Sequence, residues 1–486
     1  MDRPLSKPTV HELVESLGMG PAQISVILLG VGGIHFVYGA SFTCLNIISV
    51  SAAAEMNVSS GARGLLITNA SMGLLIGAVV ASAGDALGRL RCITTGYIMM
   101  AVSLVMTAAT MNSWFLMVLA CGGTGFGVGI GLGPSIVMLS EMTPDRWKLT
   151  VRICSSAMYI FGVQSSALLA GLDDPTLQAL TWRKLLLYAA VPPTILAILS
   201  SALLPESPVL QAAKGQHSDA YHGFQWMAEQ NGQKHVIIDY QELPQIGSSL
   251  TGPGLYERLQ VVFSGKYAFS LFAATLADFV INLAEKGRAY ANPQIFGEVS
   301  TLPAAWQILV SDLPAQVTAL LVVVIFLDLC ARKVAVMIAL CLMALGSFCT
   351  CVAGVQPLPR SPFTESVFQL ALMSLAGGCK MGFAVLYQLA VEIFHPAVAA
   401  TGSAVVICLG RFGSIAAPTM FEICQAKFGW PVFYYTIAVM SMIAAVFMWR
   451  VPSAAELEVE SVEDAHDAGS LLMNSSPTYG TISKLA

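Results

Sequence analysis

The chain has 486 residues, of which 56% are apolar and only 11% are charged. Soluble domains carry roughly a quarter charged residues, so this composition excludes a soluble multidomain enzyme and a disordered chain. The formal net charge of −5 excludes a nucleic-acid-binding protein, which would need a basic excess. The 11 cysteines lie singly in apolar stretches and indicate packing residues rather than metal ligands. We therefore expect a polytopic membrane protein with no cofactor and no metal.

Twelve segments are long and apolar enough to cross a bilayer, whose core of about 30 Å needs about 20 residues of helix. They predict an all-α membrane protein with 12 transmembrane helices, at 24–54, 64–83, 92–110, 114–140, 150–171, 183–204, 267–284, 305–327, 333–354, 366–391, 401–424 and 429–450.

One long polar interval divides these segments into six plus six. The predicted units are a cytoplasmic N-terminal segment (1–23), a first six-helix bundle (24–204), a cytoplasmic linker (205–266) with a short helix near 218–230, a second six-helix bundle (267–450) and an acidic cytoplasmic tail (451–486).

The distribution of Lys and Arg predicts the orientation. With both termini in the cytoplasm, fifteen of the 24 basic residues fall on the cytoplasmic side and two, Lys380 and Arg411, lie within spans. The sequon Asn57-x-Ser59 falls in the first outer loop and predicts a glycoprotein. The seven basic residues on the outer side are Arg63, Arg183, Lys184, Lys286, Arg288, Arg360 and Lys427.

A pattern of one acid and several bases occurs in the same place in both halves. Opposite charges at helix ends can pair, so we expect an inner gate that latches the two bundles together; alternatively, the bases only follow the positive-inside rule. The gate residues are Gly84, Asp85, Gly88, Arg89, Arg91, Glu141 and Lys148 in the first half, and Asp328, Arg332, Lys333 and Glu392 in the second.

These loops resemble the G-x-x-x-D-x-x-G-R-[RK] signature of the major facilitator superfamily, and the resemblance spans nearly the whole chain. Residues 9–23, 125–131 and 410–418 are similar to the branch of metabolite:proton symporters, synaptic vesicle protein-related proteins and organic ion transporters. Residues 205–208 are similar to a motif of sugar porters. The resemblance implies two bundles that rock around a central binding site.

The chain departs from that branch in several places. Cys121 or Gly122 stands where the branch has an arginine, and the carboxylate position of its first segment is apolar here. Both losses weigh against proton coupling. The arginine of the E-x-x-P-x-x-x-R pattern is Lys148 in the first half and Ala399 in the second, which predicts a weaker inner gate in the second half.

Four ionisable residues lie near the middle of four different segments, about 15–21 Å from one end at about 1.5 Å per residue. They are His35, Asp278, Lys380 and Arg411. Charges at this depth face a cavity or a partner, and transporters of this build bind substrate there.

We predict that Asp278 accepts a proton, and that Lys380 is either its static partner or the anchor of an anionic solute. Arg411 fits a gating role as well as solute contact, and His35 fits a packing role as well as solute contact. Structural ion pairs that never touch solute are the alternative. Polar and aromatic residues expected to complete the site are Tyr38, Asn46, Tyr159, Gln164, Asn282, Tyr387 and Gln388. Gln164 and Asn282 are favoured over the aromatic residues, because aromatic residues also pack helices.

Two further patterns concern helix geometry. Gly123, Gly127 and Gly131 recur every four residues, which predicts close helix packing. Residues 290–293, which end in Pro293, are expected to break the seventh helix at the outer face and to serve as an outer gate.

The tail contains an acidic dileucine pattern ending in Leu471 and Leu472 and a tyrosine pattern starting at Tyr479. Both predict sorting adaptors as partners, and a location in the plasma membrane or in endosomal or vacuolar membranes.

The sequence thus predicts a secondary active transporter that moves a small, charged organic solute by alternating access, with the proton as the candidate coupling ion. A facilitative sugar carrier and a non-transporting sensor on the same fold are the alternatives. An enzyme is not expected, because no HExxH, GxSxG or P-loop motif occurs.

Overall fold

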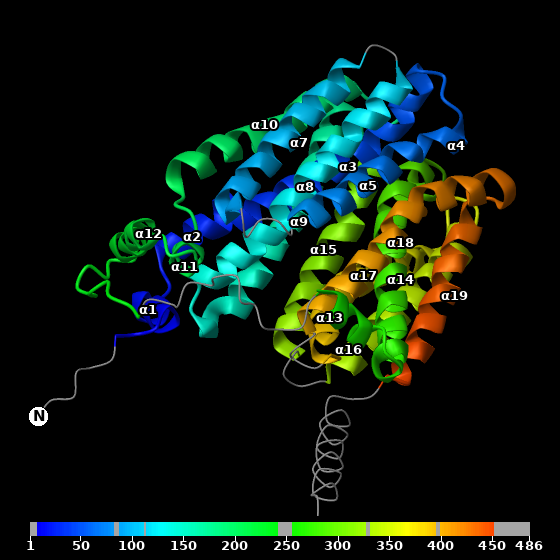
Figure 1. Ribbon diagram of the computed structural model, residues 1–486. Coiled ribbons are helices and arrows are strands. Elements are labelled where there is room, and N and C mark those ends of the chain that lie inside the picture. The colour runs from blue at the N-terminus through cyan, green and yellow to red at the C-terminus, as the bar shows by residue number, and fades with distance from the viewer. Residues whose placement is uncertain are drawn as a thin grey trace, which may run out of the picture.

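The computed structural model describes residues 7–81, 87–110, 113–241, 255–326, 331–394 and 399–451. Within these ranges, twelve helices are long and apolar enough to cross a membrane, as predicted. They form two six-helix bundles that lie side by side (Figure 1). Large apolar side chains such as Phe115, Leu172 and Trp449 are exposed on the bundle surfaces, where a bilayer would cover them.

The first bundle, here the N bundle, begins with a span that changes helix type. This span runs through α2 (Pro21–Val26), a π-helical turn (Ile27–Val31) and α3 (Gly32–Glu55). The short α4 (Ser60–Arg63) precedes the second span. The remaining spans are α5 (Leu65–Ala81), α7 (Arg89–Ala109), α8 (Trp114–Met142), α9 (Asp145–Asp173) and α10 (Trp182–Leu203).

The second bundle, here the C bundle, repeats this organisation. Its spans are α14 (Gly265–Val299), α15 (Ala304–Phe326), α16 (Arg332–Gly354), α17 (Pro362–Glu392), α18 (Ala399–Phe428) and α19 (Trp430–Trp449). In the N bundle α3 packs on α9, and α7 packs on α8 and α10. In the C bundle α14 packs on α18, and α16 packs on α17 and α19. The matching pairs support the internal repeat. The bundles contact each other through α9 with α15 and α5 with α18.

Short helices lie at one end of the two bundles. They are α1 (Val10–Leu17), α11 (Pro208–Ala213), α12 (His217–Gln230) and, next to the C bundle, α13 (Leu255–Val262). The short linker helix predicted near 218–230 is therefore confirmed as α12. Asn231, directly after α12, donates to the Leu17 and Gly18 carbonyls, both at 3.1 Å, and to Gln23 Oε1 at 3.0 Å. The linker is thus fastened to the start of the first span. We call this end of the bundles the linker end and the opposite end the far end.

The glycines of α8 allow close packing, as their spacing predicts. A Cβ atom added at Gly127 would lie 2.6 Å from the Gly96 carbonyl oxygen of α7. A Cβ at Gly131 would lie 2.7 Å from Ile34 of α3, and one at Gly123 would meet the Ser103 side chain. Larger residues at these three positions would push α8 away from α7 and α3.

The seventh span is longer than the sequence predicts. Its predicted end at 284 is wrong, because α14 continues without interruption to Val299. The predicted break at 290–293 is also wrong, since Pro293 lies inside this helix. The charged residues 285, 286 and 288 lower the local hydropathy as a loop would, but they are buried and have partners within the protein. Membrane helices tolerate proline because neighbouring groups can satisfy the freed backbone.

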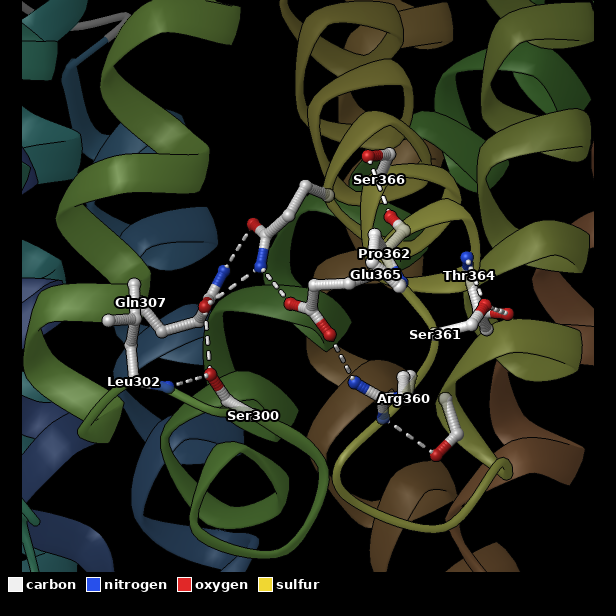
Figure 2. Close-up of polar contacts among 11 residues, drawn as sticks. Ser300, Leu302, Gln307, Arg360, Ser361, Pro362, Thr364, Glu365 and Ser366 are labelled. Carbon is white, nitrogen blue, oxygen red and sulfur yellow. Dashed lines mark hydrogen bonds and ion pairs between the residues drawn. The ribbon is translucent and has the colours of Figure 1, made fainter.

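A polar network holds the far end of the C bundle together (Figure 2). Arg360 donates to Glu365 Oε2 at 3.0 Å, and Gln369 donates to Glu365 Oε1 at 2.8 Å. Gln307 of α15 donates to Gln369 at 2.7 Å and accepts a hydrogen bond from Ser300 at 2.8 Å. The network therefore links the end of α14 to α15 and α17, and it favours motion of the C bundle as one body.

Candidate functional site

A buried cluster of charges lies at mid-height of the C bundle. Arg288 of α14 donates to Glu285 at 2.7 Å and to Asp312 of α15 at 2.8 Å. Lys380 of α17 pairs with Glu285 at 2.9 Å. The Glu285, Arg288 and Asp312 side chains are at most 9% exposed. Burial of charge is expensive unless every ion has partners, and here each carboxylate and each paired base has at least one.

Lys286 differs from the bases of this cluster. It is 5% exposed and forms no ion pair within the described ranges. Its ammonium instead lies over aromatic rings of the N bundle, 4.4 Å from the centroid of Tyr38, 5.0 Å from Phe42 and 5.5 Å from Tyr159. It also donates to the Tyr159 hydroxyl at 3.4 Å. Lys286 therefore reaches from one bundle into the other at the centre of the protein.

Lys380 also contacts the N bundle. Its ammonium lies 4.0 Å from the ring centroid of Tyr159, while its ion pair with Glu285 stays within the C bundle. The structure therefore pairs Lys380 with Glu285 rather than with Asp278, which answers a question that the sequence leaves open.

Asp278 is fully buried on α14, and neither carboxylate oxygen has a hydrogen-bond partner. Its side chain faces Gly410 of α18, where even a Cβ atom would collide with it. Arg411, the next residue, is close enough for an electrostatic interaction. Asn282 donates to the Asp278 backbone carbonyl at 2.9 Å, and its own carbonyl oxygen has no partner. A buried carboxylate without a donor is a group that favours binding a proton or a cation.

Four other predicted residues differ in what surrounds them. The His35 Nδ1 donates to the Val31 carbonyl at 2.7 Å, directly after the π-helical turn, which fits its packing role. Gln164 on α9 is buried, and neither atom of its amide has a partner. Tyr387 on α17 is half-buried, with its ring 5.8 Å from that of Phe383, and Gln388 beside it is also half-buried.

A cavity lies between the bundles, on the side of Lys286 that faces the far end. Its lining comes from α3, α9, α14 and α15 and includes both polar and apolar side chains: Thr43, Ile47, Val163, Ala289, Asn292, Pro293, Ile308 and Asp312. Asp312 belongs both to this lining and to the charge cluster. The cavity therefore borders the cluster.

An ion pair joins the two bundles at the far end. Arg63 donates from Nε to Glu422 Oε1 at 2.8 Å and from its terminal nitrogen to Oε2 at 3.0 Å, and the Tyr290 hydroxyl also donates to Glu422. Thr68 of α5 donates to the Ile415 carbonyl at 3.1 Å, and Ala305 N donates to Pro175 O at 3.1 Å. Towards the linker end the ribbons of the bundles diverge (Figure 1). The structure is therefore closed at the far end.

The predicted inner gate of the first half forms contacts within its own bundle. Arg89 pairs with Glu141 at 3.3 Å, and Ser207 donates to Glu141 at 2.5 Å. Glu206 accepts from the Arg89 backbone at 2.8 Å and so caps α7. Gly88 has φ of 109°, and a Cβ there would lie 2.5 Å from Glu206 Oε2, so both conformation and space require glycine. The sugar-porter-like residues 205–208 thus belong to this network.

The second half has a corresponding pair, Arg332 with Glu392, and Lys333 donates to the Val451 carbonyl. Lys148 pairs with Asp145 at 2.7 Å, and Arg91 is exposed. These contacts do not latch one bundle to the other, because each pair joins residues of the same bundle. Gly84, Asp85, Asp328 and the tail patterns at 471–472 and 479–482 lie outside the described residues.

Several site residues escape prediction from the sequence. Lys286 and Arg288, expected on the outer side, are buried inside α14, so that expectation is wrong. Asp312 and Glu422 lie within predicted spans, but only about 10 Å and about 3 Å from the nearer predicted end, so the depth rule that selects Asp278 misses both. Tyr38 and Tyr159, which the sequence offers as site residues, lie against Lys286 and Lys380. Phe42 carries no such signal, since aromatic residues also pack helices.

With this geometry described, comparison with known proteins identifies the family. The sequence profile of the family described as "Sugar (and other) transporter" matches residues 27–465. The chain belongs to this family. It is a major facilitator superfamily protein, and its relatives are transporters rather than enzymes.

The chain is similar to proteins of animals and plants. It is 21% identical to the putative transporter SVOPL of Danio rerio over 447 residues, which cover 86% of this chain and 83% of the relative. It is 26% identical to organic cation/carnitine transporter 7 of Arabidopsis thaliana over 464 residues, which cover 84% and 87%. The solved structure of the proton:xylose symporter XylE with 6-bromo-6-deoxy-D-glucose matches with a TM-score of 0.66 and 20% identity, over 90% of this chain and 98% of XylE. That likeness confirms the fold.

Proposed function

We propose that this transporter moves a small organic solute that carries a carboxylate, and that the solute binds between the bundles at the central charge cluster. The observation that carries the proposal is the excess of basic groups there. Among the described residues, the bases near mid-height are Lys286, Arg288, Lys380 and Arg411, and the acids are Glu285, Asp312 and Asp278. Lys286 has no carboxylate partner among them. A carboxylate is the group that completes this charge balance.

The solute would approach from the linker end in the described state. There it would meet Lys380 and Lys286, with Tyr38 and Tyr159 beside them for apolar contact. Gln164 and Asn282 have unpaired amide atoms that are suited to hydrogen-bond further polar groups of the solute.

Asp278 supports proton coupling. Protonation would remove a negative charge beside Arg411 and make the site more positive, so a proton and an anionic solute would strengthen each other's binding. This cooperation is what a symporter of an anion and a proton requires. Asp278 would then replace the acidic residue that the first span lacks.

The arrangement of contacts supports alternating access. The Arg63–Glu422 pair closes the far end, and its breakage together with closure at the linker end would expose the site on the other side. The orientation with the linker end in the cytoplasm gains support from the structure of α14. Lys286 and Arg288 lie inside α14 and no longer count as residues of the outer side. Only five of the 24 basic residues then remain on the outer side.

A ligand screen tests the function. The melting temperature of the purified protein is measured with carboxylates, organic cations, sugars and nucleosides, each at an acidic and a neutral pH. A ligand at 100 times its Kd stabilises the folded protein by about 2.7 kcal/mol, so we expect shifts with carboxylates, larger at acidic pH.

Lys380→Ala should abolish the shift, whereas Lys427→Ala, at an exposed position of the far end, should retain it. Shifts with cations alone would refute the proposed solute class.

A facilitative sugar carrier is the second candidate. Its support is the family description and the buried Gln164 amide, which is suited to bind hydroxyl groups. It predicts shifts with neutral sugars that are the same at both pH values.

A further inference from the structure

Three aromatic rings of the N bundle form a cage at the centre of the protein. Tyr38 and Phe42 are one helical turn apart on α3, with ring centroids 4.9 Å apart and planes at 87°. Tyr159 of α9 meets Tyr38 at 5.1 Å and 67°. These edge-to-face contacts hold the rings at steep angles, so that several ring faces surround one volume.

The occupant of this cage is the ammonium of Lys286, which comes from the C bundle. It lies within 5.5 Å of all three ring centroids. The attraction between a cation and a ring face is strong within about 6 Å when water is absent, and each of the three rings is at least nine-tenths buried. Neither nearby acid forms an ion pair with Lys286, since Glu285 pairs with Arg288 and Lys380, and Asp312 pairs with Arg288.

A cage of this kind recognises cations by their charge and shape, and it does not require that the cation be part of the chain. We propose that the Tyr38–Phe42–Tyr159 cage is an organic-ammonium site that the chain fills with its own Lys286. Lys286 is then a specificity-determining residue, since it excludes free organic cations from the cage and presents a positive charge at the solute site.

A cavity of about 20 Å³ adjoins the space that removal of the lysine side chain would leave. Thr43, Val163 and Ala289 line the cavity between the bundles, and each lies within one helical turn of a cage residue or of Lys286. A shortened side chain at position 286 would therefore join the cage to this cavity.

The inference rests on the proposed function only for the location of the solute site. Its test measures binding of a simple cation and requires no knowledge of the transported solute. Failure of the carboxylate screen and failure of the cage test can therefore be told apart.

The test compares wild type with Lys286→Ala. Tetramethylammonium is titrated into each purified protein, and its Kd is measured by calorimetry. The uncharged tert-butanol, which has a similar shape, is titrated in parallel. We expect the variant to bind tetramethylammonium at least tenfold more tightly than wild type does, with no such gain for tert-butanol. Addition of Tyr159→Leu to the variant should remove the gain, while Tyr159→Phe should retain most of it because the ring face remains.

Equal binding by wild type and the variant would overturn the proposal, as would equal gains for both probes. Lys286→Ser, whose hydroxyl tolerates water in the vacated space, is the second variant, with the same expected outcomes. If neither variant folds in plain buffer, purification in excess tetramethylammonium should recover folded protein, and failure to do so would also overturn the proposal.

Discussion

The ion pair between Arg63 and Glu422 is expected to set the balance between the two states of the transporter. It joins α4 of one bundle to α18 of the other, in bidentate geometry, with side chains 16% and 1% exposed. Removal of one partner of a buried pair costs about 3–5 kcal/mol. Because the pair spans the bundles, this cost falls on the state closed at the far end, whereas a pair within one bundle is present in both states.

Arg63→Ala should therefore favour the state open at the far end by about 100-fold, the ratio that corresponds to about 3 kcal/mol. Spin labels at Ser60→Cys and Ala426→Cys, both exposed near the far end, report the separation of the bundles. We expect one short distance in the parent protein and a long distance in Arg63→Ala.

Arg360→Ala is the matched control, because its partner Glu365 lies in the same bundle. It should lower stability without a change in the distance between the labels. An unchanged distance in Arg63→Ala, or equal lengthening in both variants, would refute the assignment of this pair as the far-end gate.

Three further predictions follow from the cluster and the packing. Asp278→Asn should remove the increase of uptake at acidic pH, measured in proteoliposomes; a retained increase would place the proton elsewhere. Glu285→Gln should lower the free energy of unfolding by about 3–5 kcal/mol. Asp312→Asn should lower it by less, because Glu285 pairs with two bases and Asp312 with one. Equal losses of the two variants in denaturation experiments would contradict this. Gly125→Ala, whose Cβ would collide with an α5 carbonyl, should cost about 1–3 kcal/mol, whereas Gly133→Ala in the same helix meets no atom within 4 Å and should not.

The twelve spans are predictable from the sequence because lipid imposes a minimum apolar length on each of them. The inner-gate residues are predictable for a similar local reason, since Arg89 and Glu141 lie at helix ends. Their partners are not, because the choice between a pair within one bundle and a pair across both depends on the state of the protein. Here the bundles are apart at the linker end, and Arg89 pairs with Glu141.

The centre of the site is predictable only in part. Asp278 and Lys380 are single charges in apolar surroundings, and depth along a helix is enough to select them. Lys286 and Arg288 stand next to Glu285, and a run of charges has the composition of a loop. Only the neighbouring helices, which provide Asp312 and the aromatic rings, show that these charges are compensated inside the membrane.

Counterflow in proteoliposomes tests the central claim most directly. Vesicles loaded with an unlabelled carboxylate identified by the thermal screen are placed in a trace of the same labelled compound. We expect wild type to accumulate label transiently and Lys380→Ala to accumulate none, with Lys427→Ala equal to wild type. A compound that binds wild type tightly but shows no exchange would contradict transport through the central cluster and would support a sensor built on this fold.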